Sequence, residues 1–474
     1  MLMLGGREPW WKSSAAACVA LAALTLSART ACCWLTDGPK GEDPDSYLEM
    51  ANQVLRHHTL AVDHRPTDGS LPTASRAPLY PLMLALSGLL KGKATLMGVM
   101  AVNSLLLVAT VVFTWLAGRR LWPHHPWAAM LAGAMAGVDP IAVHYSQHIA
   151  PETLALASAA FIFWRMVELD ARSTIRNAIL VGVSVGLATL GRPTFLLMVP
   201  VLALVALFLG QKQRPAGWWP SIAAFKVSSV LALSAVLVIL PWPLRNLIVL
   251  GEPIATTSHG GSTLALGNCP EMLGVVNEHG VNVVHVSRKA LDRFVASSPV
   301  VKAYLLANND PVPPPPGTER AADQWLAAQG QQFIRDHPKE FLWLAWARLK
   351  LTWSVVPPMK LEDADQVPQS PPMELPLTIW YAGIYTLALA GWWMMRGLSR
   401  TRGLWWTGTM LVLVISVFAA VYFGGPRMRA PVMPWLCLLS SNAMVVVFVQ
   451  ARLLVRRGRL VTAPQPVHSA PTRA

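Results

Sequence analysis

Ten apolar segments, each close to the length of a membrane-spanning helix, dominate this sequence. A helix needs roughly 20 apolar residues to cross the hydrocarbon core of a bilayer. The segments lie near residues 13–35, 94–118, 127–145, 153–169, 177–191, 194–210, 227–244, 376–395, 404–423 and 431–453. The pattern predicts an all-α integral membrane protein, a bundle of about ten transmembrane helices whose outer loops carry juxtamembrane helices.

The amino-acid composition favours a membrane protein and excludes two other classes. Hydrophobic residues make up 53% of the 474 residues and charged residues only 14%, whereas soluble domains carry about 25% charged residues. A cytosolic enzyme and a disordered tail protein are therefore excluded. The net charge of +14 would suggest nucleic acid as the partner of a soluble protein. Here the basic residues lie in short gaps between apolar segments, so we expect no nucleic-acid partner.

The distribution of the basic residues predicts the orientation of the bundle. Lysine and arginine concentrate in every second gap, at residues 119–120, 172–176, 212–226, 396–402 and 456–459. Cytoplasmic loops carry such an excess, so both termini are predicted in the cytoplasm of a multi-pass protein of the inner (plasma) membrane. The first apolar segment could also be a cleaved signal peptide, but its length favours a retained anchor.

This orientation divides the chain into membrane and outer parts. The expected parts are a cytoplasmic N-terminus (1–12), an N-terminal transmembrane module (13–244) that includes a first outer loop (36–93), a large outer loop (245–375), C-terminal transmembrane helices (376–453) and a disordered cytoplasmic tail (454–474). Pro78–Leu90 and Phe333–Trp353 are predicted to be helices along the outer membrane surface. Arg192 separates two short apolar segments, either as a kink in one long helix or, as we predict, in a tight hairpin.

Five arginines are predicted on the outer side, where the positive-inside rule gives no reason for them. They are Arg76, Arg192, Arg245, Arg427 and Arg429. Any one of them could extend its side chain to lipid headgroups. Five together, opposite an acidic loop, favour an anion site, because a guanidinium donates two hydrogen bonds to a phosphate and stays charged. The anion expected at this depth is a lipid phosphate, such as a polyprenyl phosphate that carries a sugar.

Carboxylates lie on the same outer side. Asp43 and Asp45 follow the first apolar segment, and Glu152 begins a later one after Pro151. A solvated loop and a favourable partner for a helix dipole are the ordinary explanations. The Asp-Pro-Asp triplet also resembles the metal-binding Asp-x-Asp of nucleotide-sugar transferases, but no nucleotide-binding domain surrounds it, and we expect no metal. Glu152 could approach Asp43 across the outer face.

Eight short motifs follow one another in the order of a known family. They are Asp43-x-x-x-Tyr47-x-x-x-Ala51, Ser75-Arg76-Ala77-Pro78-Leu79-Tyr80-Pro81, Pro151-Glu152-Thr153-Leu154, Arg192-Pro193, Pro241-Trp242-Pro243-Leu244-Arg245-Asn246, Gly260-Gly261 to Gly267-Asn268, His337-Pro338 and Arg427-x-Arg429-x-Pro431-x-x-Pro434. Over residues 14–453 the chain resembles the GT-C fold glycosyltransferases related to the protein O-mannosyltransferases and the lipid A aminoarabinose transferase. One motif departs from that family, which commonly has two prolines where this chain has Ala77 before Pro78.

The resemblance implies a GT-C-like bundle and an inverting glycosyltransferase that takes a sugar from a polyprenyl-phosphate donor without a catalytic metal or other cofactor. It makes Asp43 the general base, with Asp45 as a competitor, and Glu152 a second carboxylate. The five outer arginines are expected to bind the donor phosphate. The expected substrate contacts are Tyr47, Tyr80 and His259. The acceptor is a lipid, a glycan or a protein, and membrane lipids are further partners.

The residue types suit this chemistry, but other functions compete. A phosphate is already a good leaving group and needs cations, whereas an acceptor hydroxyl needs a general base. A transporter or flippase also carries intramembrane charges and broken helices, but it should show an internal repeat, and we find none. An O-antigen ligase or polymerase would use outer arginines but lacks this order of motifs. A structural scaffold would leave the outer arginines unexplained.

Overall fold

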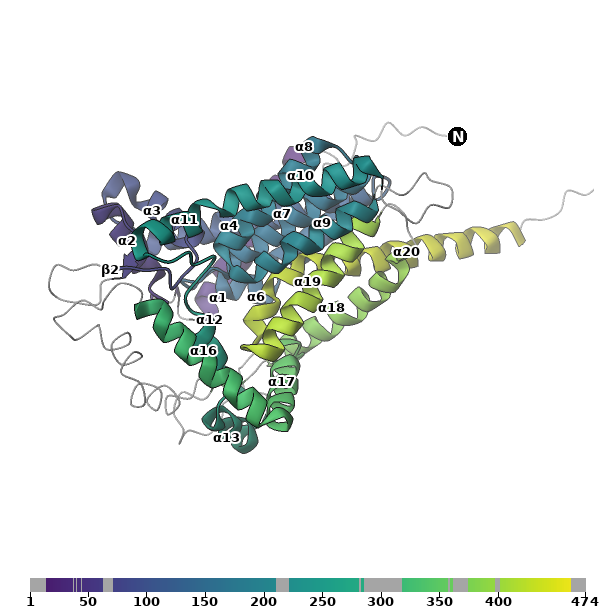
Figure 1. Cartoon of the computed structure of the whole chain (residues 1–474). Helices are drawn as coiled ribbons and strands as arrows, with labels where there is room; N and C mark the ends of the chain where they lie inside the picture. Colours follow the sequence, from purple (N-terminus) through teal and green to yellow (C-terminus); the bar gives the residue numbers. More distant parts are fainter. Residues whose placement is uncertain are drawn as a thin grey trace, which may run out of the picture.

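The computed structural model describes residues 14–36, 38–39, 41–43, 45–62, 71–209, 221–280, 283–284, 318–356, 359–360, 374–396 and 401–461. Within these residues the chain is almost entirely helical, and its strands form two pairs of two residues each. Long helices make one bundle, and shorter helices gather around one end of it (Figure 1). The predicted all-α membrane architecture is confirmed.

The long helices match the apolar segments of the sequence. They are α1 (Ser14–Leu35), α4 (Leu96–Leu121), α5 (Pro126–Gly137), α7 (Glu152–Ala171), α8 (Ile175–Gly191), α9 (Met198–Leu209), α10 (Ile222–Ile239), α18 (Glu374–Met395), α19 (Arg402–Val421) and α20 (Met433–Val461). Judged by length and composition alone, five stretches of the described chain are long and apolar enough to cross a membrane. These are Ser14–Leu35, Leu96–Leu121, Ile222–Leu250, Arg402–Val421 and Pro426–Arg452. The number of ten crossings stays a prediction.

The shorter elements connect the long helices. They are α2 (Tyr47–His57), β1 (Ala61–Val62), β2 (Leu71–Pro72), α3 (Leu79–Gly88), η2 (Leu89–Lys91), α6 (Pro140–Tyr145), η3 (Pro193–Leu197), α11 (Pro241–Leu250), α12 (Gly260–Gly267), α13 (Pro270–His279), β3 (Val283–Val284), α16 (Thr318–Asp336), α17 (Pro338–Thr352), β4 (Met359–Lys360) and η5 (Pro426–Val432). Strands β1 and β2 pair antiparallel, and β3 and β4 pair parallel. The predicted tail beyond residue 461 lies outside the described residues.

The hairpin predicted at Arg192 is confirmed. An added Cβ on Gly182 of α8 would lie 2.3 Å from the carbonyl oxygen of Leu231, so α8 packs directly on α10. The Ser228 hydroxyl, one turn earlier on α10, donates to the carbonyl of Ala203 on α9 at 2.7 Å. Since α9 thus returns to the level of the first half of α8, the chain reverses at Arg192.

Two predicted helices differ from the structure at prolines. The single helix over Phe333–Trp353 is wrong, because α16 ends at Asp336 and α17 begins at Pro338. Proline has no N–H to continue a helix but fits its first turn. The apolar segment 127–145 divides in the same way at Pro140. Asp139 then caps α6 by accepting the N–H of Ala142 at 3.0 Å.

Helix α7 lies at the centre of the bundle and defines its two ends (Figure 1). Glu152 begins it, and near its last turn Asp170 accepts the N–H of Gly403 at the start of α19 at 3.1 Å. At about 1.5 Å per residue, α7 spans close to 30 Å, the thickness of a bilayer core. We call the end at Glu152 the outer end and the end at Asp170 the inner end, following the predicted orientation.

The large outer loop is bonded to the outer end. Glu319 of α16 accepts hydrogen bonds from the hydroxyl of Thr73 and the N–H of Ala74, at 3.1 and 3.2 Å, and from the hydroxyl of Ser258. The buried guanidinium of Arg348 on α17 donates to the carbonyls of Ala420, Val421 and Gly267 and to the Asn268 amide oxygen, at 2.8 to 2.9 Å. Helices α12, α16 and α17 are therefore held over this end of the bundle.

Candidate functional site

Five charged side chains and one histidine, from six separate places in the chain, meet at the outer end. We call them the outer charged cluster, and they are Asp45, Arg76, Glu152, Arg192, His259 and Arg427. Local sequence positions two of them directly. Arg192 follows α8 and precedes Pro193, and the residue before a proline favours extended backbone. Its φ of −151° and ψ of 119° end the helix and direct the chain into η3. Glu152 starts α7 after Pro151.

Glu152 lies between two arginines in the interior of the cluster. Its carboxylate Oε1 is 3.9 Å from Nη1 of Arg192 and 4.0 Å from Nε of Arg427. The side chain of Glu152 is only 3% exposed and that of Arg192 is 11% exposed. Neither Oε2 of Glu152 nor Nη1 of Arg192 has a hydrogen-bond partner in the described part of the chain. Because buried polar atoms are normally paired, this arrangement suits a polar ligand.

The second part of the cluster comes from the first outer loop. Nη2 of Arg76 lies 2.6 Å from Oδ1 of Asp45, and its Nε donates to the Asp45 carbonyl at 3.3 Å. Ser46, the next residue, has the left-handed φ of 57°, a conformation that is uncommon for a non-glycine residue and is concentrated at functional sites. Arg427 interacts electrostatically with both Asp45 and Glu152, so the two parts form one cluster.

Asp43 has a different position from Asp45. Its carboxylate accepts the N–H groups of Tyr47, Leu48 and Glu49 at 2.8, 2.8 and 3.2 Å. These groups are the unpaired donors of the first turn of α2, so Asp43 caps that helix. Burial raises the pKa of Asp43, against the effect of its three backbone donors. Both of its oxygens are thus committed to the backbone, whereas Asp45 faces the arginines.

Of the three predicted substrate contacts, His259 belongs to the cluster, and Tyr47 and Tyr80 are buried beside it. His259 precedes α12, and its Nδ1 lies 3.0 Å from the Ser262 hydroxyl. Burial, together with Arg76, lowers the pKa of His259 to about 4, so its ring is neutral at pH 7. Tyr47 packs edge-to-face on Tyr80 with ring centroids 5.2 Å apart. Tyr80 is fully buried and donates to the Asn103 amide oxygen at 3.1 Å, so it packs against Tyr47 from the protein interior.

Two of the five predicted arginines lie outside the cluster. Arg245 donates from Nη1 to the carbonyl of Thr73 and from Nη2 to that of Leu60, each at 3.0 Å. Arg429 is buried against the ring of Tyr381, with its guanidinium carbon 4.2 Å from the centroid, and donates to the carbonyls of Thr352 and Ser354. Both guanidinium groups therefore hold loop backbone in place.

The sequence interpretation missed three residues that shape this region. Arg348 and Glu319 attach the large outer loop, and Tyr145 of α6 interacts electrostatically with Glu152 and Arg427. None of them lies in a motif that marks it. Only Arg348 could have been recognised from the sequence, because it is a charged residue on the apolar face of a predicted amphipathic helix. Among the described residues, no three histidine, cysteine, aspartate or glutamate side chains gather as ligands for a metal ion.

Comparisons with known proteins identify the fold. Residues 75–242, about a third of the chain, match the family model described as dolichyl-phosphate-mannose-protein mannosyltransferase. No curated protein matches the chain. The archaeal oligosaccharyltransferase AglB from Archaeoglobus fulgidus, solved with an inhibitory peptide and a dolichol-phosphate, superposes on 98% of the chain with a TM-score of 0.51 and 11% identity. The chain has the GT-C fold.

Two more structures of the Archaeoglobus fulgidus oligosaccharyltransferase support the GT-C assignment. One was solved with Zn and sulfate, and it matches 94% of the chain with a TM-score of 0.52 and 12% identity. The other carries a tethered acceptor peptide and matches the same share with a TM-score of 0.50 and 12% identity. This GT-C chain spans about half the length of the solved structures, 51 to 53%.

Proposed function

We propose that this protein is an inverting glycosyltransferase that moves a sugar from a polyprenyl-phosphate donor to an acceptor on the outer face of the cytoplasmic membrane. The GT-C fold and the match to a mannosyltransferase family model support the reaction class. The observation that carries the proposal is the buried pair of Glu152 and Arg192, each with a polar atom left unpartnered in the described structure, at the outer end of the bundle.

The charge of the outer cluster suits a lipid-linked phosphate. Arg76, Arg192 and Arg427 contribute three positive charges, and Asp45 and Glu152 contribute two negative ones, while His259 is neutral. One positive charge remains for an anion. Arg427 is 44% exposed and Arg192 is mostly buried, so the two together can hold a phosphate that enters from the surface. Arg245 and Arg429 are not part of this proposed phosphate site, since both guanidinium groups are bonded to backbone carbonyls.

Asp45 is the better candidate for the general base. The carboxylate of Asp43 caps α2 through both oxygens, while the side chain of Asp45 is 30% exposed at the cluster. A general base must reach the acceptor hydroxyl, so its carboxylate must be accessible at the donor site. When the donor phosphate binds, Arg76 can shift part of its hydrogen bonding to the phosphate and leave a lone pair of Asp45 for the acceptor.

The reaction is a single displacement at the anomeric carbon. The acceptor oxygen forms a bond to that carbon while its proton passes to the Asp45 carboxylate. The bond from the anomeric carbon to the phosphate oxygen breaks, and its electron pair leaves with the polyprenyl phosphate. Arg192 and Arg427 stabilise the charge that grows on the departing phosphate, so no acid is needed. Attack opposite the leaving group inverts the anomeric configuration.

The test compares Asp45→Asn with Asp43→Asn in purified protein. Sugar transfer is measured from a panel of radiolabelled polyprenyl-phosphate sugars to an envelope extract that supplies the acceptors. Asp45→Asn should reduce turnover by about 100- to 10,000-fold, the usual contribution of a general base. Asp43→Asn should retain most of the activity, because asparagine can still cap a helix. A silent Asp45→Asn variant with an inactive Asp43→Asn variant would return the base to Asp43, and no transfer by the wild type would reject the function.

A further inference from the structure

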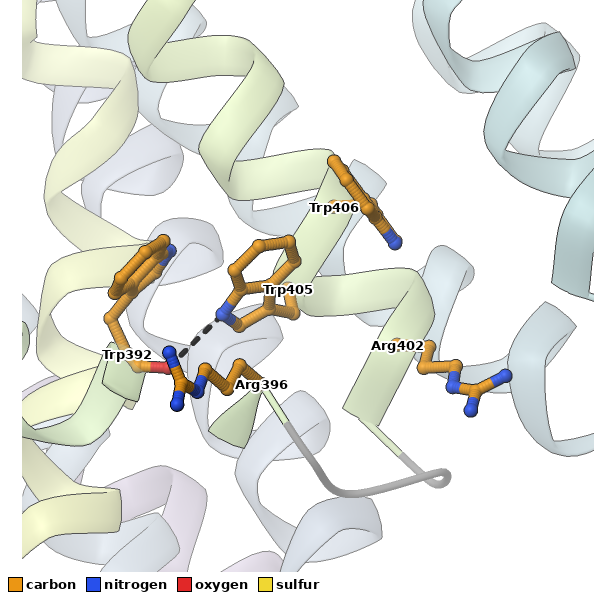
Figure 2. A pocket seen from close by; sticks show the side chains of 5 residues that line it. All are labelled: Trp392, Arg396, Arg402, Trp405 and Trp406. Carbon is orange, nitrogen blue, oxygen red and sulfur yellow. Dashed lines mark hydrogen bonds between the residues drawn. The ribbon is translucent and has the colours of Figure 1, made fainter. Parts of the chain in front are cut away.

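A separate pocket lies at the inner end of the bundle, between α18 and α19. This hollow of about 450 Å³ is lined by Trp392, Arg396, Arg402, Trp405 and Trp406 (Figure 2). Gly403, next to Arg402, is bonded to Asp170 near the end of α7. Eighteen residues of helix separate Asp170 from Glu152, which is about 27 Å. The pocket is therefore distinct from the outer charged cluster.

The three tryptophan side chains of the pocket pack against one another and form one side of it, which we call the tryptophan wall. The rings of Trp392 and Trp405 stack with centroids 5.1 Å apart, and Trp406 packs edge-to-face on Trp405 at 4.7 Å. The indole N–H of Trp405 donates to the carbonyl of Trp392 at 3.0 Å (Figure 2). The indole N–H of Trp392 donates to the Thr409 hydroxyl, also at 3.0 Å. Because the N–H groups of Trp392 and Trp405 are used within the protein, these two rings offer the pocket an apolar surface.

The two arginines give the pocket a positive charge that nothing in its lining neutralises. Arg396 and Arg402 are both exposed, and no ion pair joins either of them to another described residue. The guanidinium carbon of Arg396 lies 3.3 Å from the ring centroid of Trp393, which holds the side chain at the rim. The lining contains no carboxylate. Such a site favours an anion over a cation or a zwitterion.

We propose that this pocket binds the headgroup of an anionic phospholipid of the inner leaflet. Its distance from the outer end, about 27 Å, places it at the opposite interface of a bilayer core about 30 Å thick. Tryptophan is enriched at that depth, and arginine binds phosphate through two parallel hydrogen bonds. The phosphate would bind at Arg396 beside Trp392 and Trp405, and Arg402, whose side chain extends away from Arg396, would add positive charge to the same interface (Figure 2). The glycerol and upper acyl chains would lie against the tryptophan wall. This inference does not depend on the proposed glycosyl transfer.

Native mass spectrometry of the purified full-length protein tests the site with phosphatidylglycerol as the probe. The double variant Arg396→Ala, Arg402→Ala removes both charges at exposed positions, so folding is not at risk. The matched control is Arg172→Ala, Arg176→Ala, which removes two exposed arginines from the same end of the bundle. A third protein, Arg396→Lys with Arg402→Lys, keeps the charge and removes the planar fork. Phosphatidylcholine and soluble glycerol 3-phosphate serve as comparison ligands.

We expect one phosphatidylglycerol to bind tightly to the wild type and to the control. Its affinity should fall about 10- to 30-fold in the double alanine variant, because two positive charges near the anionic lipid are lost, and by an intermediate factor in the lysine variant. Phosphatidylcholine should bind weakly, and glycerol 3-phosphate should not compete at equal concentration. Equal losses in the alanine variant and the control, or equal binding of the two lipids, would reject a specific site. Competition by glycerol 3-phosphate would reject a lipid in favour of a free phosphate.

Discussion

Replacing Glu152 with glutamine should have opposite effects on the ligand-free protein and on its affinity for an anion. Glutamine keeps the shape of the side chain and removes its charge. Glu152 is almost completely buried, and its oxygen lies 3.9 Å from Arg192 and 4.0 Å from Arg427. The substitution therefore leaves two guanidinium groups together without the carboxylate between them.

The expected loss of stability comes mainly from Arg192. Two unit charges 4 Å apart interact by about 4 kcal/mol at an effective dielectric constant near 20. Arg427 is 44% exposed, so solvent screens its share and we assign it little. Removal of the Glu152 charge also relieves the desolvation of that carboxylate, which offsets part of the remaining term. Breaking a buried pair costs about 3–5 kcal/mol, and we expect about 2–3 kcal/mol here because no hydrogen bond joins Glu152 to Arg192.

Binding of an anion should reverse the loss of stability in Glu152→Gln. The outer charged cluster carries a net charge of +1 in the wild type and would carry +2 in Glu152→Gln. Polyprenyl phosphate should bind the variant more tightly, and a ligand that binds only the folded state raises the melting temperature. The increase in melting temperature on adding polyprenyl phosphate should therefore be larger for Glu152→Gln than for the wild type.

Tryptophan fluorescence during heating provides the assay, with and without polyprenyl phosphate in detergent. Glu168→Gln is the matched control, because Glu168 pairs with Arg120 at 3.6 Å at the inner end and both side chains are more exposed. That variant should melt within a degree or two of the wild type, as expected for a surface pair. If Glu152→Gln melts like Glu168→Gln, or if polyprenyl phosphate stabilises it less than the wild type, the electrostatic description of the site is wrong.

Three further outcomes follow from particular residues. Arg192→Lys should weaken polyprenyl phosphate binding about 10-fold or more in a sedimentation assay, because lysine lacks the fork, while the exposed Arg176→Lys should bind normally. Burial lowers the pKa of His259 from 6.5 to about 4, so the folded protein loses stability relative to the unfolded chain as the pH falls from 6.5 toward 4. His259→Asn should therefore make the melting temperature less dependent on pH over that range. Arg348→Ala removes the four hydrogen bonds of a buried guanidinium and should make α17 more sensitive to protease, whereas the substitution Lys350→Ala at an exposed position should not.

Much of the fold could be predicted because a bilayer makes length and hydropathy decisive. A helix that crosses hydrocarbon must be apolar over roughly 20 residues, so the long helices matched the apolar segments. Prolines limited the accuracy where they begin a new helix, as Pro338 and Pro140 do. A hydropathy profile does not detect these prolines, because a single residue changes the averaged hydropathy very little. The same proline nevertheless removes a backbone N–H donor and so ends a helix.

The sequence by itself predicted which end of the bundle gathers charged side chains, and the structure brings Glu152 and Arg192 together there. Arg192 and Glu152 were identified because charge beside a membrane helix is unusual wherever the topology does not require it. Their places in the chain, before Pro193 and after Pro151, also indicated that each lies at a helix end. No long-range contact was needed for that inference, because local composition sets both hydropathy and helix termination.

Only the tertiary structure decided what each charged group faces. Asp43 and Asp45 are two residues apart and similar in type, yet one caps α2 and the other pairs with Arg76, 31 residues away. By its type and its place in the chain Arg245 resembles a phosphate ligand, but its partners are the carbonyls of Leu60 and Thr73, 185 and 172 residues distant. A guanidinium or a carboxylate takes its role from the groups within about 3 Å of it, and folding alone brings such distant groups together.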